Sequence, residues 1–343
     1  MKKLQNTLYV TNPDGYLSLD GENVVVRSDD TVLGRFPLHN LENIVSFGYR
    51  GASPKLMSVC AERGVGLCFL SMHGRFLGSI SGPVQGNVLL RTTQYRTATD
   101  ADAALTISKM FLTGKIYNCR WLLEHFGRDH APRLDMDAIR AAIQQHKLAL
   151  QQIDLVSTAD ELRGIEGSAA KAYFAVFPQL ILRNEEYFSF DGRNRRPPLD
   201  PVNALLSFTY TLLGNEITGA LEGVGLDPAV GFLHTLRPGR YSLALDLLEE
   251  FRAPLADRFV LSLINLGSIT EKDFDQKENG AFYLKEDARR TFLAAWQKKK
   301  QETLTHPFLK EKMAWGLATH AQAMLLSRYL RGDLDAYPPF MWK

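Results

Sequence analysis

The hydrophobic pattern of the chain changes its period near residue 95, and this change constrains the fold more than any other feature of the sequence. Before it, short runs rich in β-branched and aromatic residues alternate with turn-forming segments such as NPDG, DGE and SDD. The runs cover residues 8–12, 16–20, 23–27 and 43–47. Strands that recur about every 8–12 residues are typical of an antiparallel sheet or sandwich. We therefore predict a small antiparallel β-sandwich-like domain at residues 1–95.

One helix is predicted to interrupt these strands. Ser53 followed by Pro54 is a typical N-cap and first helical position. The apolar run 64–71 then reads as a buried strand, and a turn at 72–75 would fold the chain back to form a hairpin.

After about residue 98 the apolar residues recur at the helical period. Leu105, Met110, Ile116 and Leu122 form the first long amphipathic pattern. Further helices are expected at residues 137–152, 158–183, 202–222, 241–251, 254–266, 285–302 and 309–331. The sequence thus predicts an α+β protein whose larger, all-helical domain covers residues 96–343.

Composition sets limits on the class of protein. A chain of 343 residues that is 45% hydrophobic is long enough for two domains with cores of their own. Its formal net charge of +2 is nearly neutral, so DNA binding would have to rest on local clusters of Lys and Arg. No apolar run approaches the roughly 20 residues that span a bilayer, and the first residues do not resemble a signal peptide. Cys60, Cys68 and Cys119 form no CxxC pair, and thiols in a reducing cytoplasm explain them. We expect a cytoplasmic protein without a membrane partner.

Glu166 is the first candidate site residue. It follows Leu162 by four residues and precedes Ala169 by three, so it lies on or beside the apolar stripe of its helix. A carboxylate in such a place is costly unless it is paired or binds a cation. A Glu at the edge of the stripe that reaches solvent explains the same spacing.

His234 is the second candidate. Asp227 and Pro228 predict the start of a short helix that leads into a loop, with His234 near its end. A hydrogen-bonded structural histidine is the simpler explanation, and a metal ligand is the alternative.

The third candidate is the acidic group Asp246, Glu249 and Glu250. These residues are three or four apart, so they lie on nearly one face of a helix. Carboxylates this close repel each other unless a cation or an arginine lies between them. Arg240 or Arg252 would serve in a plain salt bridge, and an ordinary solvated acidic face remains open.

A Glu, a His and a further acidic residue suit Mg²⁺ or Mn²⁺, and the imidazole favours manganese. No motif such as HExxH ties the three positions together, so the residues alone suggest a metal site without identifying it. Arginines occur in two groups nearby, of which one comprises Arg193, Arg195 and Arg196, and the other comprises Arg237 and Arg240. Guanidinium groups bind phosphate in a forked geometry, although solvated helix faces explain these clusters equally well.

Three long segments resemble a known family. They are LRGIEGSAAKAYF (162–174), RRPPLDPVNALLSFTYTLL (195–213) and VGFLHTLRPGRYSLALDLLEEFRAPLADRFV (230–260), and GNVLLRTTQYR (86–96) is similar too. They resemble the core of the universal CRISPR-associated integrase, the nuclease that captures new spacers into CRISPR arrays. Within this family, the chain resembles the version that accompanies the I-C subtype. The resemblance covers nearly the whole chain, and its motifs occur in the right order.

This resemblance implies an architecture and a set of partners. Members have an N-terminal β-sandwich and a C-terminal helical domain, and they form homodimers through the N-terminal region. A dimer of a small ferredoxin-like adaptation protein bridges two such dimers. The implied substrates are double-stranded DNA fragments and the CRISPR repeat with its leader.

The resemblance also implies a metal centre. Glu166 matches the first ligand through IEGSAAKAYF, His234 the second through GFLHTLRPGR, and Glu249 the third through DLLEEFR. Asp246, one turn earlier, matches another acidic residue often found in that site. The third ligand is Glu here where many members have Asp, which lengthens the reach to the metal.

The implied reaction is attack by the 3′-hydroxyl of captured DNA on a phosphate at the edge of a CRISPR repeat. Arg237 and Arg240 are the arginines expected to offset charge on that phosphate. Asn203, Ser207 and Tyr210 are expected either to face the same cavity or to pack the helix bundle. Two other functions stay open: a general metal-dependent DNase that acts on branched DNA in repair, and a non-enzymatic helical scaffold.

Overall fold

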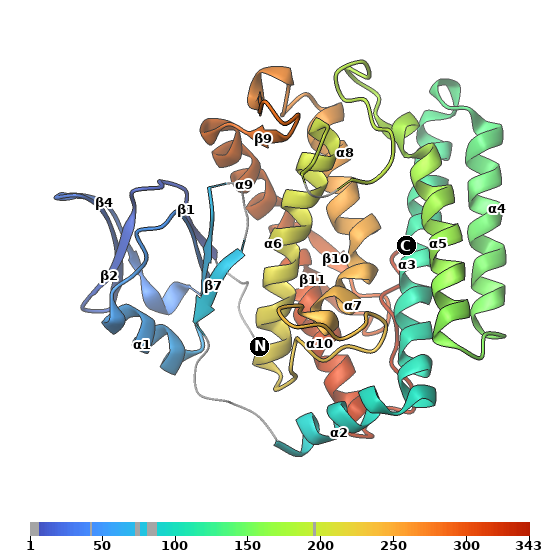
Figure 1. The fold of residues 1–343 in the computed structure, drawn as a ribbon, viewed down its shortest axis with the longest axis horizontal. Helices are drawn as coiled ribbons and strands as arrows, with labels where there is room; N and C mark the ends of the chain where they lie inside the picture. Colours follow the sequence, from blue (N-terminus) through green and yellow to red (C-terminus); the bar gives the residue numbers. More distant parts are fainter. Residues whose placement is uncertain (1–6, 42, 73–75, 81–87, 195–196) are drawn as a thin grey trace.

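The structure is a computed structural model that describes residues 7–41, 43–72, 76–80, 88–194 and 197–343. Figure 1 shows a small β-rich part in blue beside a larger helical part. This arrangement confirms the predicted α+β class. In the part of the chain that is described, no helix is long and apolar enough to cross a membrane.

The first sheet is the antiparallel meander that the sequence predicts. Its strands β2 (Tyr16–Asp20), β3 (Asn23–Ser28) and β4 (Thr31–Pro37) pair in the order β2-β3-β4. Val24 and Val25 of the central strand are buried, whereas β4 lies at the edge of the sheet and leaves most of its side chains exposed. A short 3₁₀ turn (Leu38–Asn40) follows it.

The second sheet is mixed, which refines the antiparallel prediction. It has the order β1-β5-β6-β7. Its strands are β1 (Thr7–Val10), β5 (Asn43–Phe47), β6 (Gly66–Leu70) and β7 (Phe76–Ile80). The pairs β1–β5 and β5–β6 are parallel, and only β6–β7 is antiparallel. The β5–β6 pair is parallel because the helix α1 (Pro54–Arg63) crosses over between these strands and returns the chain in the same direction.

Helix α1 begins as its sequence predicts. The Ser53 hydroxyl accepts a hydrogen bond from the Leu56 N–H at 3.2 Å, and Pro54 occupies the first helical position. Antiparallel pairing of β6 with β7 confirms the predicted hairpin, although most of its turn, residues 73–75, lies outside the described residues.

The helical part contains long helices close to the predicted ranges. They are α2 (Val88–Thr99), α3 (Ala101–His130), α4 (Met136–Ile153), α5 (Ala159–Val176), α6 (Pro201–Gly223), α7 (Ser242–Phe251), α8 (Arg258–Asn265), α9 (Glu286–Gln301) and α10 (Trp315–Leu330). A π-helical segment (Arg252–Asp257) joins α7 to α8. Short 3₁₀ turns occur at Ala131–Arg133, Phe177–Leu180 and Glu271–Asp273.

The helical part is not purely helical, which corrects the prediction. Two short antiparallel pairs occur in it, formed by β8 (Phe274–Gln276) with β9 (Phe282–Leu284) and by β10 (Thr303–Thr305) with β11 (Lys312–Ala314). The helix expected from residue 309 therefore begins at Trp315, because the preceding residues pair as a strand. The predicted boundary at residue 95 falls inside α2.

The two parts share one core. Val45, Phe47 and Leu70 of the mixed sheet pack into the hydrophobic core of the helices. At the same junction the Lys300 ammonium of α9 lies 2.7 Å from the Glu216 carboxylate of α6. Glu216 Oε1 also accepts hydrogen bonds from the Trp296 indole (3.0 Å) and the Tyr9 hydroxyl (3.3 Å). This buried cluster fixes β1 against α6 and α9.

The segment after α10 folds back along α3, where Figure 1 marks the C-terminus. Tyr337, Phe340 and Trp342 of this segment are buried. The Asn118 amide donates to the Phe340 carbonyl at 2.7 Å, and its oxygen accepts from the Trp342 N–H at 2.9 Å. We call residues 337–342 the docked tail. It packs against α3 and α7, the two helices that also carry residues of the candidate site.

Candidate active site

Asp246 on α7 holds the His234 ring in place. The carboxylate is fully buried, at 0% exposure. Its Oδ1 accepts from the backbone N–H of His234 at 2.9 Å and lies 2.7 Å from the ring nitrogen Nδ1. Its Oδ2 accepts from the N–H groups of Phe232 (2.6 Å) and Leu233 (3.0 Å). An Nδ1–H that donates to a carboxylate leaves Nε2 as the free lone pair, which is the arrangement of metal-binding histidines.

The role of Asp246 as a possible further metal ligand stays a prediction, and in this structure both of its oxygens accept hydrogen bonds from the His234 loop. A second expectation for this loop is wrong. The short helix expected after Asp227 and Pro228 does not form, since the described chain there makes only turns. Instead the Pro228 carbonyl accepts from the N–H groups of Leu243 (2.9 Å) and Ala244 (3.2 Å) at the start of α7. The loop and the helix therefore stabilise each other.

Gly231 makes this close approach possible. A Cβ at Gly231 would lie 2.6 Å from Asp246 Oδ2 and 2.7 Å from the Leu243 nitrogen, which no side chain permits. Sequence reasoning did not assign Gly231 a role. Its place three residues before His234 was the available signal.

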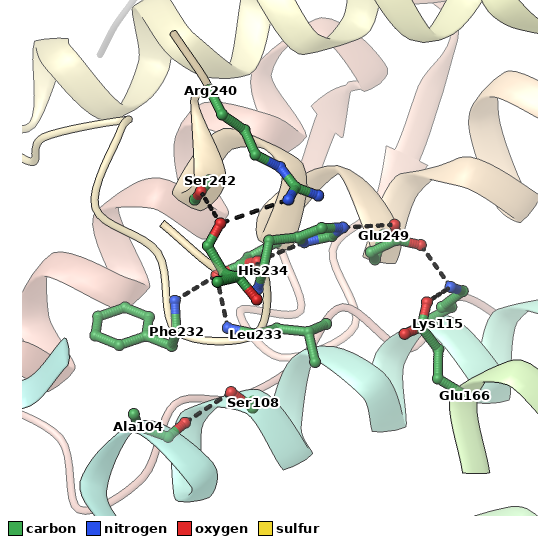
Figure 2. Close-up of polar contacts among 12 residues, drawn as sticks. Ala104, Ser108, Lys115, Glu166, Phe232, Leu233, His234, Arg240, Ser242 and Glu249 are labelled. Carbon is green, nitrogen blue, oxygen red and sulfur yellow. Dashed lines mark hydrogen bonds and ion pairs between the residues drawn. The ribbon is translucent and has the colours of Figure 1, made fainter. Parts of the chain in front are cut away.

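Glu166, His234 and Glu249 come together from α5, the loop and α7 (Figure 2). The Glu249 Oε1 atom lies 3.8 Å from His234 Nε2 and 3.1 Å from Arg252 Nη2. Between the two glutamates lies the ammonium group of Lys115 from α3, 2.6 Å from Glu166 Oε1 and 2.9 Å from Glu249 Oε2. The structure thus places the two glutamates on one positive charge and the His234 ring beside the second of them.

The electrostatics of Glu249 follow from these neighbours. Burial alone raises the pKa of this carboxyl, but Arg252, Lys115 and His234 together lower it to about 2. Burial lowers the pKa of Lys115, but Glu249 and Glu166 reverse the effect and hold it above the ordinary value. Glu249 is therefore ionised at any physiological pH. Arg252 is the salt-bridge partner that the sequence had left open for this acidic group.

The side chains of this site are of the types that bind a divalent cation, but in this structure they are not arranged around a common point. Among the residues that the structure describes, no group of three His, Cys, Asp or Glu side chains lies ready to hold an ion. Two carboxylates nevertheless converge on one cation, and His234 Nε2 faces Glu249 from the side. Two oxygen donors and one oriented imidazole are the donor set that Mg²⁺ or Mn²⁺ takes. A metal ion bound by Glu166 and Glu249 would occupy the position that the Lys115 ammonium occupies here.

The arginines behave differently from one another. Arg237 is exposed on the loop after His234, and Arg240 donates to the Thr235 carbonyl at 3.5 Å. Arg195 and Arg196 lie outside the described residues.

The polar residues of α6 divide between two tasks. Arg193 donates to the Asn203 side chain and, at 3.1 Å, to the Ser207 hydroxyl, so these residues fix the loop before α6. The Tyr210 hydroxyl donates to Asp257, and the Arg252 guanidinium lies 4.8 Å above the Tyr210 ring. Tyr210 therefore supports the arginine that pairs with Glu249.

Glu250 points away from the site and binds the docked tail. Its Oε2 accepts from the Gln322 amide (2.9 Å), the Tyr337 hydroxyl (3.1 Å) and the Phe340 N–H (3.1 Å). Burial raises the pKa of Glu250 to about 8. The acidic group read from the sequence thus divides into three roles: Asp246 orients the histidine, Glu249 faces the centre, and Glu250 holds the tail.

The raised pKa of Glu250 predicts a loss of stability at alkaline pH. The folded pKa of about 8 exceeds the reference value of 4.5, so the folded chain binds the extra proton. The contribution of Glu250 to the free energy of unfolding is therefore fully present below about pH 4.5 and is lost as pH rises toward 8. We expect Glu250→Gln to flatten this fall between about pH 5 and 8 in urea denaturation, while Glu278→Gln on the surface leaves it unchanged. An unaltered slope in the Glu250 variant would contradict the assignment.

Comparisons with known proteins agree with the geometry. The family model described as CRISPR associated protein Cas1 matches residues 8–298. The CRISPR-associated endonuclease Cas1 1 of Chlorobaculum tepidum is 52% identical over 345 residues, which is 100% of each chain. A structure titled casposase bound to integration product superposes with a TM-score of 0.84 at 24% identity, over 98% of this chain and 93% of the other. The Cas6-RT-Cas1–Cas2 complex matches with a TM-score of 0.83 at 22% identity, over 99% of this chain and 36% of that one.

These findings confirm the family that the sequence motifs resemble. The family model covers most of the chain, and the Chlorobaculum relative aligns from end to end. The two solved structures show that the fold is shared. The chain belongs to the Cas1 family of CRISPR-associated proteins.

Proposed function

We propose that this protein is a metal-dependent DNA endonuclease and integrase that inserts captured DNA fragments into a CRISPR repeat array. The observation that carries the proposal is that Glu166 and Glu249 share one cation while the His234 ring lies beside Glu249, in a chain of the Cas1 family. The curated relative is named an endonuclease, and the casposase with the same fold holds an integration product. Both names support phosphodiester chemistry at this centre.

Each residue of the centre has a defined task in this proposal. Held by Glu166, His234 and Glu249, Mg²⁺ or Mn²⁺ would polarise the scissile phosphate and stabilise the leaving 3′-oxygen. Asp246 keeps the imidazole turned so that Nε2 faces the ligands. Arg252, which already pairs with Glu249, places a guanidinium where negative charge develops on the phosphate.

Membership of the Cas1 family also supports a set of proposed partners. DNA would contact Arg237 and Arg240 beside the His234 loop, and a small ferredoxin-like adaptation protein would bridge two dimers, as in the I-C subtype. The homodimer would form through the N-terminal part. Edge strand β4 supports this, because Val32, Leu33 and Phe36 are exposed on it. An apolar, unpaired edge strand is a ready surface for a second copy. The cytoplasm, where CRISPR arrays are located, is the proposed compartment.

A strand-joining assay tests the proposal. A labelled donor duplex with 3′-hydroxyl ends and a plasmid that carries the repeat are incubated with protein in Mn²⁺, in Mg²⁺ or in EDTA. We expect the label to enter the plasmid only with metal and only from the 3′-hydroxyl donor. A matched dideoxy-terminated donor is the control, because it lacks the attacking group.

The alternatives give other results in the same assay. A general repair DNase would cut branched DNA with metal but would join nothing. A scaffold would bind DNA with no effect of metal on any product.

A further inference from the structure

Lys115 brings a positive charge into the centre of the proposed active site. Its Nζ atom contacts Glu166 at 2.6 Å and Glu249 at 2.9 Å (Figure 2). The side chain is only 10% exposed, whereas lysine normally keeps its ammonium hydrated. The two carboxylates therefore replace the water that this ammonium would otherwise hold.

A rigid-body shift of helix α3 cannot remove the Lys115 ammonium from this position, because the helix is closely packed. A Cβ at Gly114, next to Lys115, would lie 3.1 Å from the Glu250 side chain and 3.3 Å from that of Pro339. One turn later the Asn118 amide donates to the Glu250 carbonyl at 2.7 Å. Because the backbone of α3 is held against α7 and the docked tail, the ammonium can leave only by rotation of its own side chain.

The position between the Glu166 and Glu249 carboxylates can hold one cation but not two. Glu249 is buried and Glu166 is 27% exposed, so without a cation their charges would repel in a poorly hydrated place. A divalent ion bound to the same two oxygens would lie within a few ångström of the ammonium, and like charges at about 4 Å repel strongly at low dielectric. Lys115 and the metal therefore exclude each other from this point.

We propose that Lys115 is the resident counter-ion of the active site, which holds Glu166 and Glu249 in the metal-free protein and must be displaced before a divalent metal binds. This inference rests on the metal dependence proposed above. It adds that Lys115 sets how tightly the site binds the metal. Lys115 acts here as a positioning residue: it lowers metal affinity and stabilises the metal-free fold.

The structure offers a place for the displaced side chain. A cavity beside Lys115 is lined by Tyr173, Tyr210 and Asp257. The Asp257 carboxylate accepts hydrogen bonds from both tyrosine hydroxyls, so it already lies in a polar corner of this cavity. An ammonium that rotates out of the metal position would find a carboxylate there.

Manganese affinity tests the inference without reference to catalysis. Free Mn²⁺ is followed by its electron paramagnetic resonance signal during titration of wild type, Lys115→Met and Lys109→Met. Lys109 is the matched control, because it lies on the same helix and its ammonium contacts only the Asp154 carbonyl among the hydrogen bonds described for it. We expect Lys115→Met to bind Mn²⁺ at least about tenfold more tightly than wild type, which is about 1.4 kcal/mol. Lys109→Met should match wild type.

Thermal unfolding supplies a second readout. In EDTA, Lys115→Met should melt at a lower temperature than wild type, because two carboxylates lose their cation. Saturating Mn²⁺ should raise its melting temperature by more than it raises that of wild type. If Lys115→Met does not fold, Lys115→Gln, which keeps a hydrogen-bond donor, takes its place in both measurements.

The outcomes separate the two proposals. If neither wild type nor the Lys115 variants bind Mn²⁺, or if His234→Ala leaves Mn²⁺ binding unchanged, the metal site itself is overturned. If wild type binds Mn²⁺ through His234 and the Lys115 variants bind with unchanged or weaker affinity, the metal site stands and the counter-ion role is wrong.

Discussion

Replacement of His234 by alanine is expected to abolish strand transfer, by about a thousandfold or more, while DNA binding and thermal stability stay close to wild type. The imidazole supplies Nε2 to the proposed metal, and loss of a group that acts directly on the reacting centre typically costs this much. The ring is partly exposed, and Asp246 keeps its three backbone donors after the substitution. The loop should therefore keep its shape. Rates come from the strand-joining assay, and affinities from fluorescence anisotropy with labelled donor DNA.

His39→Ala is the matched control, because this histidine is exposed in the β-rich part. Glu166→Ala should lose strand transfer in the same way. For Glu249 we choose glutamine, because alanine would leave Lys115 and Arg252 without their buried partner, at a cost of about 3–5 kcal/mol. Integration at the wild-type rate by His234→Ala, with metal present, would remove this residue from the mechanism.

Phe340→Ala is expected to lower the free energy of unfolding by about 3–5 kcal/mol. The ring is fully buried, and its centroid lies 4.7 Å from that of Phe251 on α7 and 5.9 Å from that of Trp315. Alanine would leave a cavity between α7 and the docked tail, and the tail contacts Glu250 directly. Because Glu250 precedes Phe251 and follows Glu249, we also expect slower strand transfer in the variant that remains folded.

The neighbouring residue provides the control for this substitution. Met341 is 36% exposed, so Met341→Ala should change the free energy of unfolding by less than about 1 kcal/mol. Both values come from urea denaturation at one pH. Equal losses in the two variants would show that the tail contributes no specific packing.

The division into strands and helices was predictable because hydrophobic period is a local property of the sequence. The capped start of α1 at Ser53 was visible for the same reason, because a helix cap depends on neighbouring residues alone. The parallel pairing of β5 with β6 was not visible, since it depends on where α1 carries the chain. The strand β11 was also missed, because three residues are too few to show a period.

The grouping of the candidate residues was predictable, and their surroundings were less so. Family motifs identified Glu166, His234 and Glu249, whereas the spacing of Asp246, Glu249 and Glu250 placed all three on nearly one face. Their partners differ only because the folded chain packs the His234 loop against Asp246 and the docked tail against Glu250. Lys115 went unnoticed because a lysine in an amphipathic helix usually reaches solvent. Its place directly before the buried Ile116 was the signal that could have found it.

The docked tail also has a consequence for biosynthesis. Phe340 and its partner Asn118 are 222 residues apart in the chain. During translation, α3 therefore leaves the ribosome long before the segment that completes its packing. Until then the nascent chain exposes the apolar surface that Phe340 and Trp342 later cover, which is the kind of surface that chaperones bind. The packing of α3 and α7 can therefore be completed only after residues 337–342 have been synthesised.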